Sequence, residues 1–130
     1  MIYRRYTQGT GKRYRSCITS YCVVTDVIQA KTNNRCLMTF EELKQRIGNK
    51  SVFDEAELLK QYNSFRNFTI IEMLYYGYFG AGNNVNMNWL DNNGCWANEG
   101  QYPTDVHLNE NQFRKILVEG KVNVSNVIID

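Results

Sequence analysis

Proline, histidine and long apolar runs are almost absent from this 130-residue chain. One proline leaves no material for a proline-rich linker, and every histidine-dependent mechanism rests on a single residue, His107. No stretch approaches the roughly 20 apolar residues of a membrane-spanning helix, and residues 7–16 are polar where a secretory signal carries its apolar core. We therefore expect a cytoplasmic protein that does not enter a membrane.

Disulfide and metal-binding frameworks are missing as well. Without an export signal, the four cysteines are expected to be reduced thiols. Two of them are five residues apart, which places them on opposite faces of a continuous strand, and no Cys-x-x-Cys pair occurs. We expect no disulfide, no metal and no cofactor, and we expect small buried hydrophobic residues at Cys17, Cys22, Cys36 and Cys95.

Recognisable catalytic motifs are also lacking. The two glycines in residues 8–12 are separated by one residue, whereas a phosphate-binding P-loop needs four residues between its glycines and a Ser or Thr after the lysine. Cys95, His107 and Asp105 are the residue types of thiol catalysis, so a small cysteine-dependent enzyme remains an alternative. The main expectation is a protein that is not an enzyme.

Basic and aromatic residues are concentrated near the start of the chain. Arg and Lys neutralise phosphates or carboxylates, and tyrosine rings stack on bases. We predict residues 2–15 to be a contact segment, with residues 3–6 and 12–15 paired as a hairpin around a glycine turn. A solvated strand edge that resists aggregation is the alternative. The predicted contact residues are Tyr3, Arg4, Arg5, Tyr6, Lys12, Arg13, Tyr14 and Arg15.

Charge and composition are uneven along the chain. Residues 1–35 carry a net charge of +6 and residues 36–130 a net charge of −4, which favours an oriented electrostatic encounter. Asparagine occurs sixteen times and alanine four times, as is typical of AT-rich coding sequences. Together with the small size, this composition indicates a low-GC bacterium, one of its phages or a mobile element as the source.

Four helices are predicted. Three begin at a capping box, in which a cap residue and a Glu or Gln three positions later bond reciprocally, and each ends at a glycine. A fourth spans residues 51–65. Acidic residues at 41–42 and 54–57 fall in first turns, where negative charge meets the helix dipole favourably. The predicted boxes are Thr39 with Glu42, Thr69 with Glu72 and Asn109 with Gln112.

Three further segments have the pattern of strands. Residues 16–30 are rich in Ile, Val, Thr and Tyr and predict a long, largely buried strand, or two strands broken near Asp26. Alternating residues in 82–100 predict a second hairpin, and residues 122–129 predict a closing strand. The order of elements indicates an α+β fold, a single compact domain over residues 1–130 with a mostly antiparallel sheet and about four short helices.

An aromatic cluster lies within the predicted helix that begins at Thr69. Four adjacent aromatic residues cannot all face inward at a period of 3.6, and tyrosine is favoured at interfaces. We predict a protein interface, in a homo-oligomer or with another protein, with core packing as the alternative. The interface residues are Tyr75, Tyr76 and Tyr78.

These features together predict a small non-enzymatic binding protein, encoded by a phage or mobile element. We expect it to engage and inhibit a host nucleic-acid-handling or defence complex through its basic aromatic N-terminal hairpin. Its partner would be a host protein or nucleoprotein complex in the host cytoplasm, with direct contact to nucleic acid. Direct DNA or RNA binding as the sole function is the first alternative, and the cysteine-dependent enzyme is the second.

Overall fold

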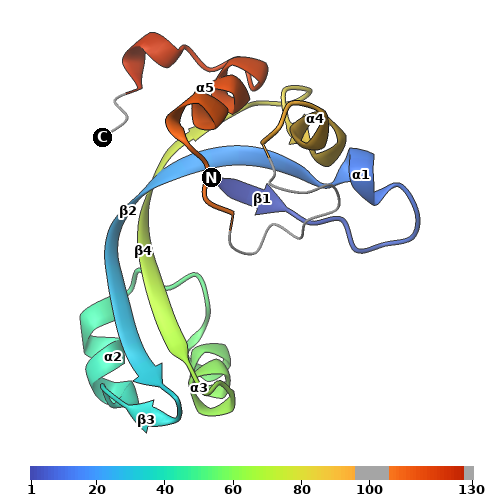
Figure 1. The fold of residues 1–130 in the computed structure, drawn as a ribbon. Coiled ribbons are helices and arrows are strands. Elements are labelled where there is room, and N and C mark those ends of the chain that lie inside the picture. The colour runs from blue at the N-terminus through green and yellow to red at the C-terminus, as the bar shows by residue number, and fades with distance from the viewer. Residues whose placement is uncertain (96–105, 128–130) are drawn as a thin grey trace. The chain divides into compact units, whose positions relative to one another are not determined.

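The computed structural model of the chain describes residues 1–95 and 106–127 and has the predicted α+β class, with helices around an antiparallel sheet (Figure 1). The chain divides into two compact units. Unit 1 comprises Met1–Cys22 and Tyr75–Asp130, and unit 2 comprises Val23–Leu74. Two long strands, β2 (Cys17–Thr32) and β4 (Phe68–Tyr78), run through both units. The expectation of one folding domain stays a prediction.

The strand β2 organises the sheet. It pairs with β4, and the Phe79 amide, just after β4, donates to the Thr19 carbonyl at 2.9 Å. In unit 1, β1 (Ile2–Arg4) and β5 (Val85–Asn86) both pair antiparallel with the start of β2. In unit 2, β3 (Arg35–Cys36) pairs with the end of β2 after a two-residue turn at Asn33 and Asn34, both with positive φ, as such hairpin turns require.

Burial along β2 differs from the prediction of a largely buried strand. Both ends are buried, because Ile18 packs in the core of unit 1 and Ile28 in the core of unit 2. Val23, Val24 and Val27, in the middle of the strand, are about half exposed. The apolar residues on both faces of this segment identified a strand correctly but did not indicate burial.

Unit 2 has two helices. The first, α2 (Phe40–Ile47), begins at the predicted capping box of Thr39 and Glu42. The second, α3 (Glu55–Ser64), begins four residues after the predicted start at residue 51, because the Asp54 side chain caps it by accepting a bond from the Glu57 amide. Both helices cover the core of this unit, which is formed by Ile28, Ala30, Leu43, Ile47, Leu58, Tyr62 and Phe68.

Unit 1 has three α-helices among its described residues, α1 (Lys12–Arg15), α4 (Met87–Asn92) and α5 (Glu110–Glu119), and a 3-10 turn, η1 (Val124–Asn126). The helix α5 has the predicted capping box. Gly120 ends it with a φ of −70°, and a side chain there would lie 2.7 Å from the Phe79 ring, so the glycine permits close packing. The buried residues are Ile18, Tyr21, Phe79, Val85, Leu90, Cys95, Ile116 and Leu117.

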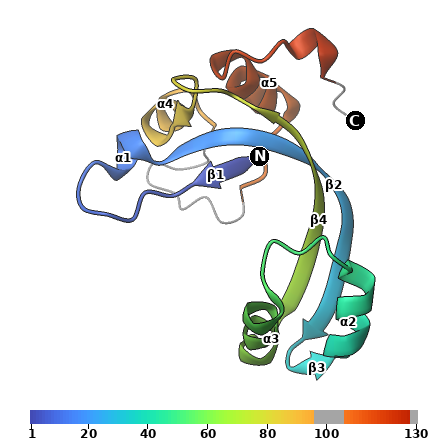
Figure 2. The same ribbon diagram turned by 180° about the vertical axis from the view of Figure 1, so that it is seen from behind.

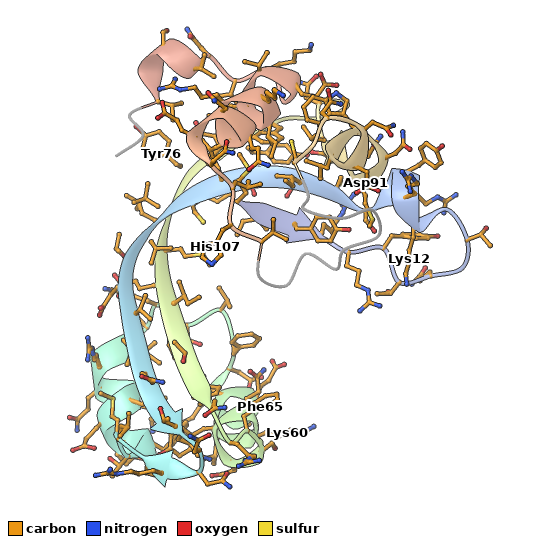
Figure 3. All side chains as sticks on the ribbon, in the orientation of Figure 1. Lys12, Lys60, Phe65, Tyr76, Asp91 and His107 are labelled. Atoms are coloured by element: carbon orange, nitrogen blue, oxygen red, sulfur yellow. The ribbon has the colours of Figure 1, made fainter. Side chains whose placement is uncertain are left out.

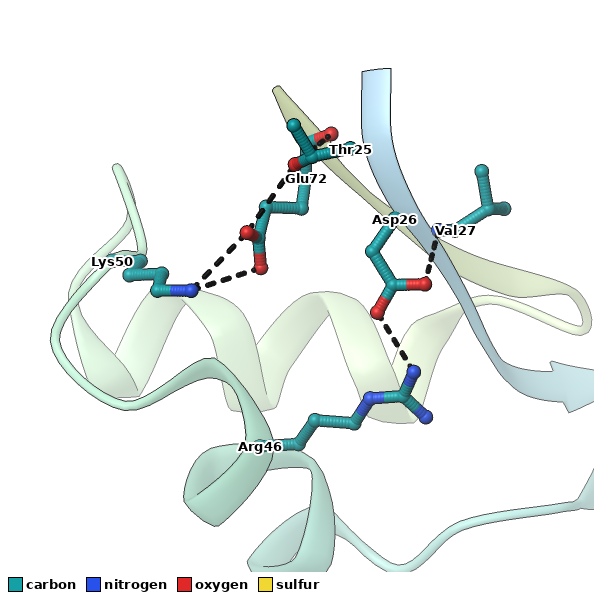
Figure 4. Close-up of polar contacts among 6 residues, drawn as sticks. All are labelled: Thr25, Asp26, Val27, Arg46, Lys50 and Glu72. Carbon is teal, nitrogen blue, oxygen red and sulfur yellow. Dashed lines mark hydrogen bonds and ion pairs between the residues drawn. The ribbon is translucent and has the colours of Figure 1, made fainter. Parts of the chain in front are cut away.

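The predicted helix after Thr69 is wrong, because this segment is the strand β4. Its β-branched residues and tyrosines favour a strand, and pairing with the long β2 decides the outcome. The Glu72 carboxylate does not cap a helix. It accepts bonds from Lys50 and from Thr25 on β2, as Figure 4 shows.

Two predicted strand segments also differ. The hairpin expected in residues 82–100 begins as the short β5, but the Asn86 side chain then accepts a bond from the Trp89 amide and caps α4. Residues 96–105 lie outside the described part of the chain. The closing strand expected at 122–129 is replaced by η1 within its described residues, and residues 128–130 are not described.

None of the helices in residues 1–95 and 106–127 is long and apolar enough to cross a membrane. In unit 1, α1 and α4 lie side by side in both views of the ribbon (Figures 1 and 2). This pairing connects the basic N-terminal segment to the rest of the unit.

Candidate anion-binding site

The N-terminal contact segment does not form the predicted hairpin. Residues 3–6 and 12–15 are not paired with each other, because β1 pairs with β2, in a register that places Tyr3 opposite Ile18. Gly11, with a φ of 88°, is the N-cap of the helical turn α1. The amides of Tyr14 and Arg15 each donate a hydrogen bond to the Gly11 carbonyl at 3.1 Å. The glycines did mark a turn, but the turn leads into a helix.

The helix α1 is joined to α4 through Arg13. The Nη2 atom of Arg13 lies 3.2 Å from Oδ2 of Asp91, and its Nε donates to Oδ1 of Asn88 at 2.9 Å. The Asp91 side chain is only 3% exposed (labelled in Figure 3). A second connection is backbone to backbone, since the Met87 amide donates to the Ser16 carbonyl at 2.9 Å. These contacts set where α1 lies on unit 1.

An open pocket of about 620 Å3 lies beside α1 and β1, entirely within unit 1. Three arginines line it, and among the described residues of its lining none is acidic. We call it the arginine pocket. Its size falls in the range of about 300–1,000 Å3 that is usual for ligand sites. Its lining is Arg4, Arg5, Tyr6, Thr7, Gln8, Tyr14, Arg15, Cys17, Asn84 and Asn86.

Arg15 and Arg4 each contact a neighbouring side chain. The Arg15 guanidinium lies over the Tyr6 ring, 4.9 Å from its centre, and Nη1 of Arg15 donates to the Tyr6 hydroxyl. This stacking orders the Arg15 side chain without neutralising its charge. Arg4 lies at the rim, where Nη2 is 4.0 Å from the Cys17 sulfur. Tyr14 is 66% exposed and offers an aromatic face at the pocket.

The chemistry of this pocket suits an anion attached to a planar group. Guanidinium groups stay charged at physiological pH and bond phosphate in bidentate geometry. An exposed tyrosine ring adds a surface on which a base can stack. Because guanidinium charge and an aromatic face occur in one pocket, a nucleotide unit matches both.

The predicted contact residues thus separate into two groups. Five of them line the arginine pocket. Tyr3 is half-buried, packs against the core of unit 1 and approaches the Met87 sulfur. Lys12 is exposed at the start of α1 outside the pocket lining (Figure 3), and Arg13 is engaged with α4. The five that line the pocket are Arg4, Arg5, Tyr6, Tyr14 and Arg15.

Sequence reasoning missed the asparagines of the pocket. Asn84 and Asn86 line it although they are distant from the N-terminal segment in the sequence, and the short β5 brings them there by pairing with residues 17–18. Nothing in the local sequence marks this long-range pairing. The abundance of asparagine in residues 82–100 is the available signal, but the hairpin prediction rests on the alternation of residues in this segment.

The tyrosines of the predicted protein interface lie on β4. Tyr75, Tyr76 and Tyr78 are each more than half exposed and are not core, whereas Phe79, the fourth aromatic residue of the cluster, is buried. Tyr76, which is labelled in Figure 3, also contacts the Tyr21 ring, with centroids 5.6 Å apart. Burial, with a contribution from Tyr76, raises the pKa of Tyr21.

The thiol chemistry considered from the sequence does not match the surroundings of Cys95. Its side chain is 1% exposed, and burial raises its pKa, which disfavours the thiolate that a nucleophile needs. His107 is exposed, and Asp105 lies outside the described residues. Within the described ranges, no three His, Cys, Asp or Glu side chains form a metal-binding group.

Acidic residues in unit 2 have structural partners. The Glu42 carboxylate accepts bonds from the amide and hydroxyl of Thr39, and these bonds lower its pKa. The bond from Arg46 to Asp26, 2.7 Å, is the largest cause of a lowered Asp26 pKa (Figure 4). The capping role predicted for the acidic residues at 41–42 is therefore seen at Glu42.

Comparison with known proteins gives no family assignment: no protein-family model, curated protein or solved structure matches the chain.

Proposed function

We propose that this protein is a non-enzymatic binding protein that engages single-stranded nucleic acid through the arginine pocket. The observation that supports this proposal most strongly is the composition of one pocket, where Arg4, Arg5 and Arg15 occur beside the exposed ring of Tyr14. Arginines neutralise backbone phosphates, and the ring stacks on a base.

Unpaired nucleic acid is favoured over duplex by the aromatic part of the site. A base can stack on Tyr14 only when its face is free, which it is in a single strand but not inside a base-paired helix. The N-terminal segment also lacks a helix long enough to lie in a major groove. Its helix α1 is a single turn, and Arg13 of that turn is held by α4.

The test is fluorescence anisotropy with a labelled single-stranded oligonucleotide, the same sequence as a duplex, and unlabelled polyglutamate as a competitor. The proposal expects the single strand to bind more tightly than the duplex and to resist polyglutamate. If polyglutamate displaces the oligonucleotide at equal charge concentration, the pocket recognises negative charge alone and the proposal fails.

A protein or nucleoprotein complex is the second candidate partner, favoured by the exposure of Tyr75, Tyr76 and Tyr78. In this case the protein would inhibit a host nucleic-acid-handling or defence complex. Affinity capture from lysate, with and without nuclease, separates the candidates. Loss of all partners after nuclease supports direct nucleic acid binding, whereas a partner that survives nuclease and is lost with Tyr75→Ser and Tyr78→Ser supports the complex.

A further inference from the structure

The ion pair between Arg13 and Asp91 is unusual for its burial. The Asp91 side chain is 3% exposed, whereas the Arg13 side chain is 36% exposed. Neither carboxylate oxygen accepts a hydrogen bond from the described residues, so the attraction to Arg13 at 3.2 Å is Coulombic. A buried charge without its partner is strongly unfavourable, so Asp91 constrains where the Arg13 guanidinium can lie.

Asn88 fixes the same guanidinium from a second direction. Its Oδ1 accepts from Nε of Arg13 at 2.9 Å, and Asn88 and Asp91 are three residues apart on α4 and therefore on one face of that helix. Arg13 is thus held by two side chains of α4, a helix that is distant from it in the sequence.

The helix α1 needs such support. It is four residues long, and an isolated single turn is not stable in water. Its two residues after Arg13, Tyr14 and Arg15, both line the arginine pocket. If α1 frays, the stacking ring and one of the three arginines lose their positions together.

We propose that Asp91 and Asn88 are positioning residues that hold α1 through Arg13 and so place Tyr14 and Arg15 in the arginine pocket. This inference rests on the proposed function for its binding readout. It assigns Arg13 to positioning, in contrast to the direct contact predicted from the sequence.

The charge change of one substitution makes the inference testable. Asp91→Asn removes a negative charge and releases a guanidinium beside a site for anions. A purely electrostatic site would therefore bind an anionic oligonucleotide more tightly after this substitution. Positioning predicts the opposite sign, weaker binding despite the more positive protein.

The experiment measures single-stranded oligonucleotide affinity by anisotropy, and amide hydrogen exchange, for the full chain and its Asp91→Asn variant. The matched control is Glu110→Gln, which neutralises an acid of the exposed Arg114–Glu110 pair on α5, 2.9 Å. We expect Asp91→Asn to weaken binding about tenfold or more, as the loss of a stacked base does. We expect the Tyr14, Arg15 and Ser16 amides to lose protection, with β2 and α5 unchanged. The control should change neither readout.

Asn88→Ala covers the case in which Asp91→Asn fails to fold, because it removes one bond to Arg13 and no charge. A double-mutant cycle with Arg13→Gln adds a second criterion. Positioning predicts that Arg13→Gln costs little more affinity in the Asp91→Asn background, whereas a direct phosphate contact predicts its full effect there. Unchanged or tighter binding by Asp91→Asn with intact protection overturns the inference.

Failure of the proposed function has a different signature. If the unmodified protein binds no oligonucleotide, the proposed function fails. The exchange measurement then still decides whether Asp91 holds α1, because it needs no ligand.

Discussion

The two units of this protein use their charges differently. Unit 2 has seven basic and seven acidic residues. Its ion pairs include Lys44–Glu55 at 2.7 Å. Figure 4 shows two more, Arg46–Asp26 at 2.7 Å and Lys50–Glu72 at 3.1 Å. In unit 1, the first 22 residues have five basic side chains and no acid. Arg13 is paired with Asp91, while three other arginines line one pocket.

This difference separates charges that pair across elements of the fold from charges that are gathered at one pocket. In unit 2, Lys44, Arg46 and Lys50 each neutralise an acid from another element. In the arginine pocket, three arginines line one cavity, and an anion bound there would offset their mutual repulsion. Total charge, only +2, hides this contrast. The pairing of individual charges is therefore a better guide to function here than the net charge of the chain.

The largest expected effect tests whether the two units are separate in stability as well as in charge. Leu43→Ala opens a cavity in the core of unit 2 and should lower the free energy of unfolding by about 2–5 kcal/mol. Because β2 and β4 run through both units, we expect one cooperative transition. Both tryptophans belong to unit 1, so their fluorescence should follow the shifted circular-dichroism midpoint in urea. A fluorescence midpoint that stays at its original value would show two independent domains.

The next effect sharpens the contrast between available and paired cations. Arg4→Ala with Arg15→Ala removes two charge-assisted contacts and should weaken single-stranded oligonucleotide binding by at least about a hundredfold in anisotropy. The matched control, Lys44→Ala with Arg46→Ala, removes the same charge from unit 2. Equal losses in the two variants would contradict a localised site and indicate an effect of net charge alone.

A smaller effect concerns the aromatic part of the pocket. Tyr14→Ala should cost about 1–3 kcal/mol of binding free energy, because it removes the exposed ring on which a base stacks. Tyr14→Phe keeps the ring and should bind nearly as well as the parent. Isothermal titration with one oligonucleotide measures both. If the two variants lose the same affinity, the hydroxyl rather than the stacking face is responsible.

The smallest effect is on pH dependence. The Glu42 pKa is lowered in the folded state, so its contribution to stability is present above its ordinary value of about 4.3 and is lost as the pH falls through the folded value. The pKa of Asp26 is also lowered, so its contribution to stability depends on pH in the same way. We expect the urea concentration at the unfolding midpoint to decrease as the pH drops below about 4. The decrease should be smaller in Glu42→Gln, which keeps the cap but cannot titrate. The pocket arginines do not titrate in this range. An identical acid response of Glu42→Gln and the parent would argue against this assignment.

The sequence predicted elements wherever local signals and tertiary contacts agree. Thr39 with Glu42 and Asn109 with Gln112 both cap helices, and residues 17–32 form the expected long strand. The same box spacing at Thr69 predicted a helix where the structure has the strand β4. The neighbouring residues are β-branched and aromatic, and β2 offers an edge for pairing. Asn86 misled in the opposite sense, since its side chain caps a helix in a segment with strand spacing.

The candidate site was predictable in composition but not in geometry. The basic and aromatic character of residues 3–15 is local, and five of its eight marked residues line one pocket. Arg13 could not be assigned in advance, because its partner Asp91 is 78 residues further along the chain. The same holds for Asn84 and Asn86, which reach the pocket through the pairing of β5 with β2.

The salt dependence of binding tests the arginine pocket most directly. The affinity of a single-stranded oligonucleotide is measured by anisotropy between 50 and 300 mM KCl, conditions chosen near the physiological range. If Arg4, Arg5 and Arg15 each neutralise one phosphate, the slope of log affinity against log salt is about −2, and it falls to about −0.7 in the Arg4→Ala and Arg15→Ala variant. A slope near zero, or one that the double substitution leaves unchanged, would contradict the assignment of this pocket to nucleic acid.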